Sequence, residues 1–145
     1  MRYRDFTAKK QAAYNDFLDK YAFFAFNEKQ FAEGMKKLDL DPETDKGALC
    51  NLGGGGFLLK AHARGFAELA DRTAKERQAL IDDPETGAAF ARDMFLTELE
   101  DHEYSWTGDA ADALTALGYT WDRVQADPVL KRAFEEAEKI AAQRE

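Results

Sequence analysis

The chain has 145 residues, of which 45% are hydrophobic and 12% aromatic, so it is long and apolar enough to bury a core. Twenty Lys and Arg against 28 Asp and Glu give a net charge of −8, which disfavours nonspecific binding to nucleic acid or anionic lipid. The single cysteine, Cys50, excludes an internal disulfide and a zinc site built from several cysteines. We find neither a long uncharged run nor a secretory signal, and therefore expect a cytoplasmic protein with no membrane contact.

Acidic residues are concentrated in the later part of the chain. Residues 1–37 carry a net charge of +3, and residues 38–145 carry −11. The densest segment, 98–112, contains no Lys or Arg and holds six carboxylates: Glu98, Glu100, Asp101, Glu103, Asp109 and Asp112. Like charges at this density repel one another, so the segment is either a solvated face or a docking surface for a cationic partner.

The first third of the chain is predicted to form a helix, a strand and a second helix. Apolar side chains recur at near-helical spacing over residues 5–20, which predicts an amphipathic helix. The uncharged, aromatic-rich run 21–26 predicts a strand buried on both faces. Asn27 followed by Gln30 resembles a capping box and predicts a helix over 28–38.

A glycine-rich hairpin is predicted next. Asp41-Pro42 indicates a helix of one or two turns before Gly47. Two short apolar runs, 48–52 and 57–60, then flank four glycines, Gly53, Gly54, Gly55 and Gly56. Such a pattern is typical of two paired strands, which together with the 21–26 strand would form a three-stranded antiparallel sheet.

The remainder of the chain is predicted to be helical. Apolar periodicity, Asp-Pro starts and a glycine stop place helices over 62–82, 85–104, 109–117, 121–126 and from Asp127-Pro128 onward. We therefore expect one α+β domain over residues 1–145. A small three-stranded sheet in the N-terminal half would pack with about five to six helices, and the C-terminal half would be all helical.

The four glycines do not fit a nucleotide-binding loop. A phosphate loop needs a Lys and a Ser or Thr at the start of the next helix, whereas a strand-like run follows Gly56. A dinucleotide loop would open a helix directly after its glycines. We interpret Gly53–Gly56 as a tight or bulged hairpin, with close approach of a partner or ligand to its bare backbone as the alternative.

Metal-type ligands crowd at one place only. Glu98 and His102 stand four residues apart, with Glu103 beside them, so one face of a helix could present them to an ion. No Glu-x-x-His spacing occurs, and His62 is the only other histidine. We expect no metal and interpret His102 as a helix C-terminal residue part-buried by Trp106. A metal-binding protein or enzyme centred on Glu98, His102 and Glu103 is the alternative.

Nucleophilic catalysis has little support in the sequence. Cys50 lies in an apolar run without a neighbouring histidine or base, as inert buried thiols do. No Gly-x-Ser-x-Gly motif occurs. We therefore expect no catalytic residues and no cofactor.

Residues 109–126 have the pattern of a helix-turn-helix, with a glycine in the turn and Thr120 as a cap. The second helix offers one Arg against one Asp, too little positive charge for phosphate contacts, so we expect no direct nucleic-acid binding. A transcriptional accessory using this element is a weaker alternative. Trp106 and Trp121 flank residues 107–118, and we expect them to cover the core, although exposed tryptophans would suit a binding interface.

A series of segments carries a resemblance to a known family: 24–38, 52–57, 93–99, 102–104, 107–109 and 112–119. Together they resemble small proteins of unknown function carried by phages and mobile elements of gut bacteria. The resemblance covers residues 21–140. It implies genes on mobile DNA and implies no activity or catalytic residues.

These observations favour a non-enzymatic interaction protein whose six carboxylates in 98–112 contact a protein with a basic surface. Carboxylates can mimic the spacing of phosphates, so an acidic protein can occupy a groove built for nucleic acid. An anti-defence inhibitor of the anti-CRISPR kind is the concrete hypothesis. The sequence leaves the oligomeric state open.

Overall fold

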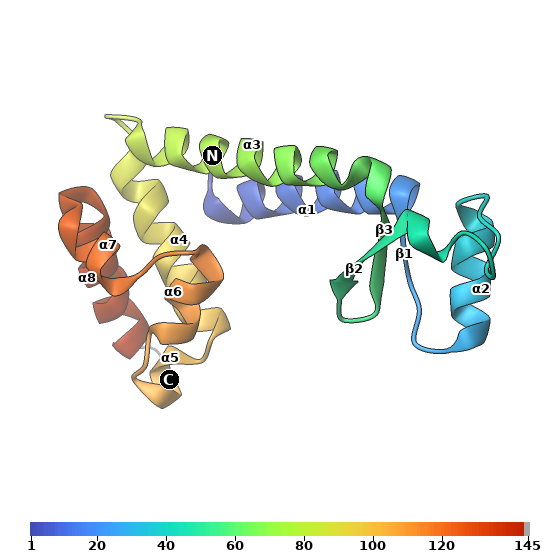
Figure 1. The fold of residues 1–145 in the computed structure, drawn as a ribbon. Helices are drawn as coiled ribbons and strands as arrows, with labels where there is room; N and C mark the ends of the chain where they lie inside the picture. The colour runs from blue at the N-terminus through green and yellow to red at the C-terminus, as the bar shows by residue number, and fades with distance from the viewer. Residues whose placement is uncertain (144–145) are drawn as a thin grey trace. The chain divides into compact units, whose positions relative to one another are not determined.

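The protein is an α+β protein, as a computed structural model describing residues 1–143 shows (Figure 1). These residues form eight α-helices, two 3-10 helices and a three-stranded sheet. In chain order the elements are α1 (Tyr3–Tyr21), β1 (Ala22–Phe24), α2 (Glu28–Lys37), η1 (Lys46–Ala48), β2 (Leu49–Gly53), β3 (Gly56–Leu59), η2 (Lys60–His62), α3 (Ala63–Asp82), α4 (Gly87–Asp101), α5 (Tyr104–Thr107), α6 (Ala111–Leu117), α7 (Trp121–Ala126) and α8 (Pro128–Gln143).

The chain forms two compact units. The helical unit comprises Met1–Ala8 and Glu76–Glu145, and the sheet unit comprises Lys9–Lys75. Helices α1 and α3 each contribute residues to both units. The single domain expected from the sequence stays a prediction.

The sheet unit is built on three antiparallel strands in the order β1-β3-β2. Phe23 of β1 pairs with Phe57 of β3, and both rings lie on the face that α2 covers. Met35 of α2 is fully buried against this face. The other apolar residues of this core are Ala25, Phe31, Leu38, Leu40, Leu49 and Leu59.

Strand β1 is shorter and more exposed than the sequence predicts. Tyr21 ends helix α1, and the strand covers only Ala22–Phe24. The side chains of Phe24 and Phe26 are 55% and 76% exposed. The expected burial on both faces holds at Ala22 and Phe23, which point to opposite faces and are both buried, and is wrong at Phe24 and Phe26. Helix α2 covers the Phe23 face, and the opposite face is buried at the pair Ala22 and Leu58.

The predicted glycine hairpin is confirmed, and two physical reasons explain its composition. Gly53, Gly54 and Gly55 have φ angles of +80°, +57° and +83°, a region that residues with a Cβ rarely adopt. A Cβ on Gly55 would overlap the ring of Phe26, and one on Gly56 would lie 3.0 Å from the ring of Phe24. The chain's own phenylalanines thus approach Gly55 and Gly56 closely, whereas no atom of residues 1–143 lies within 4 Å of a Cβ added to Gly53 or Gly54, and approach of a partner or ligand to this loop stays a prediction.

The predicted cap of α2 is also present. The Asn27 side-chain oxygen accepts a hydrogen bond of 2.8 Å from the Gln30 N–H. The Gln30 side chain accepts in turn from the N–H of Phe26, at 2.8 Å, rather than from the cap residue itself. The two bonds fix the direction in which the chain leaves β1 and enters the helix.

Two of the three Asp-Pro sequences, at Asp41 and Asp83, mark turns rather than helix starts, whereas Asp127-Pro128 begins α8 as predicted. The carboxylate of Asp41 accepts the N–H groups of the next residues, and only the 3-10 helix η1 follows, so the predicted helix here is wrong. Asp83 forms the same turn, and α4 therefore begins at Gly87 instead of 85. The Thr86 and Glu85 N–H bonds hold the pKa of Asp83 below its usual range.

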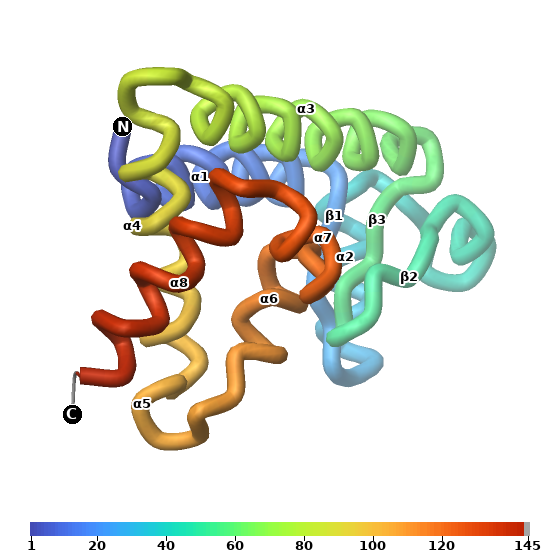
Figure 2. The backbone as a smooth tube through the Cα atoms, turned by 90° about the vertical axis from the view of Figure 1, so that its left-hand side faces the viewer, coloured from blue at the N-terminus to red at the C-terminus, as the bar shows by residue number. Residues whose placement is uncertain are grey.

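The helical unit is organised around α4, which lies alongside α8 (Figure 2). The ring of Phe95 meets the ring of Phe134 edge-on, with centroids 5.4 Å apart. At the other end of α4, Tyr3 and Phe6 pack against Phe90. The remaining buried residues of this core are Ile81, Ala91, Met94, Leu99, Ala113, Leu114, Leu117, Val124, Leu130, Ala133, Ala137 and Ala141.

The contact between Gly34 and Phe23 provides a test of the packing in the sheet unit. A Cβ on Gly34 would overlap the Phe23 ring. We expect Gly34→Ala to lower the free energy of unfolding by about 1–3 kcal/mol, measured by urea denaturation, although alanine normally stabilises a helix. Gly47→Ala is the control, since no atom lies within 4 Å of its added Cβ. A Gly34→Ala variant as stable as the wild type would contradict this packing.

Candidate functional site

The acidic segment, residues 98–112, runs from the last turn of α4 through α5 to the first turn of α6. Its two ends are fixed by buried side chains, Leu99 on α4 and Ala113 and Leu114 on α6. The stretch without Lys or Arg extends beyond this segment and covers residues 93–122. A basic side chain can therefore reach these carboxylates only from elsewhere in the chain or from another molecule.

The charge of the protein resides in the helical unit. The sequence of that unit has nine basic and 18 acidic residues, a net charge of −9. The sheet unit has 11 basic and ten acidic residues, a net charge of +1. The acidic segment accounts for six of the 18 carboxylates of the helical unit.

Glu98 is tied to the N-terminal helix. Its side chain is 16% exposed and accepts a hydrogen bond of 2.7 Å from the hydroxyl of Tyr3. The second carboxylate oxygen lies 3.7 Å from Nδ1 of His102. Asp93 holds the same end of α1, since its carboxylate accepts the backbone N–H of Tyr3 at 2.8 Å. Glu98 therefore contributes negative charge to the acidic segment although its side chain is largely buried.

Sequence reasoning missed Tyr3 and Asp93 because the partners stand about ninety positions apart, and no local pattern reports such a pair. Burial of Tyr3, followed in importance by the hydrogen bond to Glu98, raises the pKa of the tyrosine above its usual range.

The other carboxylates of the segment are exposed. Asp101 lies 3.9 Å from Arg4, and both side chains remain more than half exposed, so this pair contributes little stability. Asp109 accepts the N–H of Ala111 at 2.8 Å and so helps to begin α6. Asp112 lies in the first turn of α6, where the helix dipole favours a negative charge. Glu100 and Glu103 complete the set.

Trp106 is exposed in the middle of the acidic segment. Its side chain is 88% exposed, so the expectations that it covers the core and part-buries His102 are both wrong. The short helix α5 that carries it begins after Glu103 and ends before Gly108, both in the left-handed conformation with φ of 58° and 64°. The reversal at Glu103 falls inside the predicted helix 85–104, and α4 accordingly ends at Asp101, while the reversal at Gly108 ends α5.

Trp121 differs from Trp106 in having a partner. It is 54% exposed, and its ring lies edge-on to Phe134 with centroids 5.6 Å apart. Trp121 is thus partly used by the core, as expected, whereas no ring contact of Trp106 occurs among residues 1–143.

The residues of the metal alternative are only partly brought together. His102 ends α4, and its Nδ1 lies 2.8 Å from the carbonyl oxygen of Glu98. Within residues 1–143, no group of three or more His, Cys, Asp or Glu side chains is arranged to hold a metal ion. Glu98 is in addition occupied by Tyr3.

The helix-turn-helix pattern over 109–126 forms as α6, a turn at Gly118 and α7. Thr120 accepts the N–H of Arg123, as the sequence predicts. The guanidinium of Arg123 lies 3.3 Å from the carboxylate of Asp127, so the basic side chain of α7 already has an acidic neighbour.

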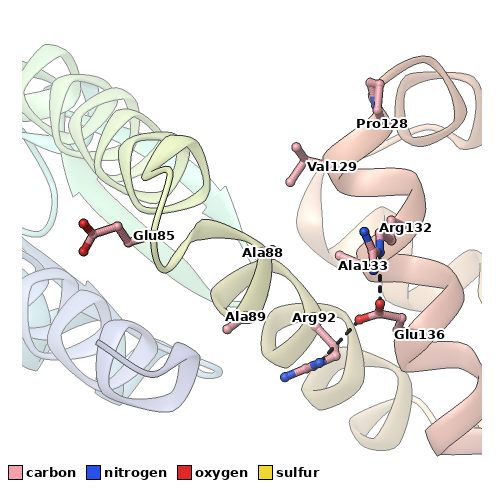
Figure 3. Close-up of a pocket in the computed structure, with 9 residues that line it drawn as sticks. All are labelled: Glu85, Ala88, Ala89, Arg92, Pro128, Val129, Arg132, Ala133 and Glu136. Atoms are coloured by element: carbon pink, nitrogen blue, oxygen red, sulfur yellow. Dashed lines mark hydrogen bonds and ion pairs between the residues drawn. The ribbon is translucent and has the colours of Figure 1, made fainter.

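A groove of about 620 Å³ lies between α4 and α8 (Figure 3). Arg92 and Arg132 both reach the carboxylate of Glu136, at 3.4 and 3.2 Å. Small side chains, Ala88 and Ala133 among them, line its walls. The Glu136 carboxylate is thus already paired with both arginines, and its pair with Arg92 joins α8 to α4 across the groove.

The fold and the acidic segment define an α+β protein with a strongly negative helical unit. The chain belongs to DUF7659, a family of unknown function, whose family model matches residues 2–139. Membership of a family without an assigned activity, as the resemblance implied, is thereby confirmed. No curated protein and no solved structure matches the chain. Among residues 1–143, no helix is both long and apolar enough to cross a membrane.

The bond between Tyr3 and Glu98 predicts a specific pH dependence. Because folding raises the pKa of Tyr3, its stabilisation is complete below about pH 10 and is lost as the pH rises further. We expect Tyr3→Phe to lower the free energy of unfolding by about 1–2 kcal/mol at pH 7. The variant should also lose less stability than the wild type above pH 10, as measured by denaturant titrations at several pH values.

Tyr14→Phe is the matched control. The Tyr14 ring packs edge-on against Phe66, and within residues 1–143 its hydroxyl makes no hydrogen bond. The control should follow the wild type over the whole pH range. Equal profiles for Tyr3→Phe and the wild type would show that the bond to Glu98 does not form.

Proposed function

We propose that the protein is a non-enzymatic interaction module whose acidic segment binds the basic surface of a protein partner. The observation that carries the proposal is the exposed Trp106 within thirty residues, 93–122, that contain no Lys or Arg. Indole rings attract Arg and Lys through their faces, and neighbouring carboxylates bind the same cations by hydrogen bonds. An aromatic residue set among charges of one sign is therefore suited to a partner rich in Arg or Lys.

The backbone of α5 supports this role. An 88% exposed indole on a long mobile loop would lose much conformational freedom on binding. Here the N–H of Gly108 bonds to the Tyr104 carbonyl at 2.8 Å and closes the turn of α5, and the Tyr104 hydroxyl donates to Glu138 of α8 at 3.0 Å and ties that turn to the helix. Trp106 is thus presented on a short, braced turn.

The finer form of the proposal concerns the cellular setting. We infer a cytoplasmic protein encoded by a phage or mobile element, acting as an anti-defence inhibitor of the anti-CRISPR kind. A helical unit of charge −9 suits a groove that normally holds the phosphates of nucleic acid. An inhibitor of this type competes with nucleic acid for its partner and needs no catalytic residue of its own.

The proposal predicts where a cationic probe binds. In a Trp121→Phe background, Trp106 is the only tryptophan, and its fluorescence should change saturably on titration with a nona-arginine peptide. Neutralising Glu100, Glu103 and Asp109 to the corresponding amides should weaken binding about tenfold or more at 50 mM salt. The dependence of binding on salt should become flatter at the same time.

The matched control neutralises three exposed carboxylates of the sheet unit, Asp19, Glu33 and Glu43. It changes the net charge equally and should weaken binding by no more than about twofold. If both triple variants weaken binding alike, or if Trp106 fluorescence does not respond, the acidic segment is not the docking surface.

A further inference from the structure

A second candidate site lies in the sheet unit, away from the acidic segment in the sequence. A pocket of about 470 Å³ is formed where α2 begins beside the sheet, within the size range of small-molecule sites. Its lining comes from the turn between β1 and α2, the first turns of α2, the loop before η1, the start of η1 and strand β3: Ala25, Asn27, Glu28, Phe31, Ala32, Pro42, Lys46 and Phe57.

The pocket has an aromatic wall. The rings of Phe31 and Phe57 meet edge-on, with centroids 5.2 Å apart, and Phe23 stacks behind Phe57 at 5.4 Å. Ala25, Ala32 and Pro42 complete the apolar lining. Such a wall suits an aromatic or aliphatic group of the size of an amino-acid side chain.

Two opposite charges line the same pocket without pairing. Among residues 1–143, neither Glu28 nor Lys46 has an ion-pair partner within 4.0 Å, and the two do not reach each other. The ammonium of Lys46 lies 5.9 Å from the centroid of the Phe31 ring, so it is positioned over the aromatic wall. The side-chain oxygen of Asn27 is used by the helix cap, which leaves its N–H groups to donate.

We propose that this pocket binds a small zwitterion with an apolar body, of the class of free aromatic or large aliphatic α-amino acids. The side chain would lie on Phe31 and Phe57, the carboxylate would contact Lys46, and the ammonium would contact Glu28. A ligand with a carboxylate alone would leave Glu28 without an opposite charge, and a ligand with an amine alone would leave Lys46 without one. The site is independent of the proposed partner surface, because all its residues belong to the sheet unit.

Three probes of one shape test the charge requirement. L-phenylalanine is the zwitterion, 3-phenylpropanoate lacks the ammonium, and 2-phenylethylamine lacks the carboxylate. Binding to the full chain is followed by chemical shifts of backbone amides in residues 25–57. We expect saturable binding of L-phenylalanine with a Kd of about 1 mM, and binding of the other two about fivefold or more weaker.

Substitutions of the two charges should separate the probes. Lys46→Gln should weaken the binding of L-phenylalanine and of 3-phenylpropanoate about fivefold and leave the binding of 2-phenylethylamine unchanged. Glu28→Gln should weaken the binding of L-phenylalanine and of 2-phenylethylamine and leave the binding of 3-phenylpropanoate unchanged. Lys29→Gln and Glu33→Gln are the matched controls on the same helix, because neither residue lines the pocket.

Ala32→Trp fills the pocket and should abolish binding of L-phenylalanine, with an unchanged circular dichroism spectrum as the check that the variant folds. The proposal is overturned if L-phenylalanine shows no saturable binding up to about 50 mM, far above the expected Kd. It is equally overturned if the three probes bind alike or if Lys46→Gln and Glu28→Gln behave as their controls do.

Discussion

The helical unit depends on the burial of α4. This helix packs along α8, and its side chains Phe90, Met94, Phe95 and Leu99 are almost completely removed from water. Each such side chain contributes about 1.5–3 kcal/mol when buried, so this interface supplies much of the stability of the unit. Because the apolar residues of α4 face the core, the last turn of this helix has a fixed position. The acidic segment begins in that turn and is positioned by it.

The first residues of the chain contact the carboxylates at the α4 end of the acidic segment. Arg4 of α1 lies near Asp101, and the hydroxyl of Tyr3 bonds to Glu98. Both contacts come from the first residues of the chain and lie at the α4 end of the segment. The helical unit has a net charge of −9 and the sheet unit one of +1, so the negative charge of the chain is concentrated in one unit. A field of this sign would speed association with the cationic partner that we propose.

Local signals in the sequence predicted local structure well. The Asn27 cap, the glycine hairpin and the Thr120 cap all depend on residues a few positions apart, and each is present. The Asp-Pro signal was right at Asp127, where α8 begins, and wrong at Asp41 and Asp83, because an aspartate can accept the same N–H groups in an isolated turn as at a helix start. The fold class followed from patterns of this kind, together with the periodicity of the long helices.

The candidate site was predicted less completely. The six carboxylates are visible in the sequence, but the bond of Glu98 to Tyr3 is not, since it joins residues 95 positions apart. Aromatic residues were expected in the core, yet Trp106, Phe24 and Phe26 are exposed. Burial of an aromatic side chain depends on which element covers it, and that is decided by tertiary packing rather than by the neighbouring sequence.

The central claim, that the acidic segment is the docking surface, is tested most directly by mapping a cationic ligand on the isotopically labelled chain. Amide chemical shifts recorded during titration with an arginine-rich peptide report every residue separately. The account predicts that the changes concentrate in residues 98–112 and on the indole N–H of Trp106. Changes spread evenly over both units, or concentrated in the sheet unit, would contradict it.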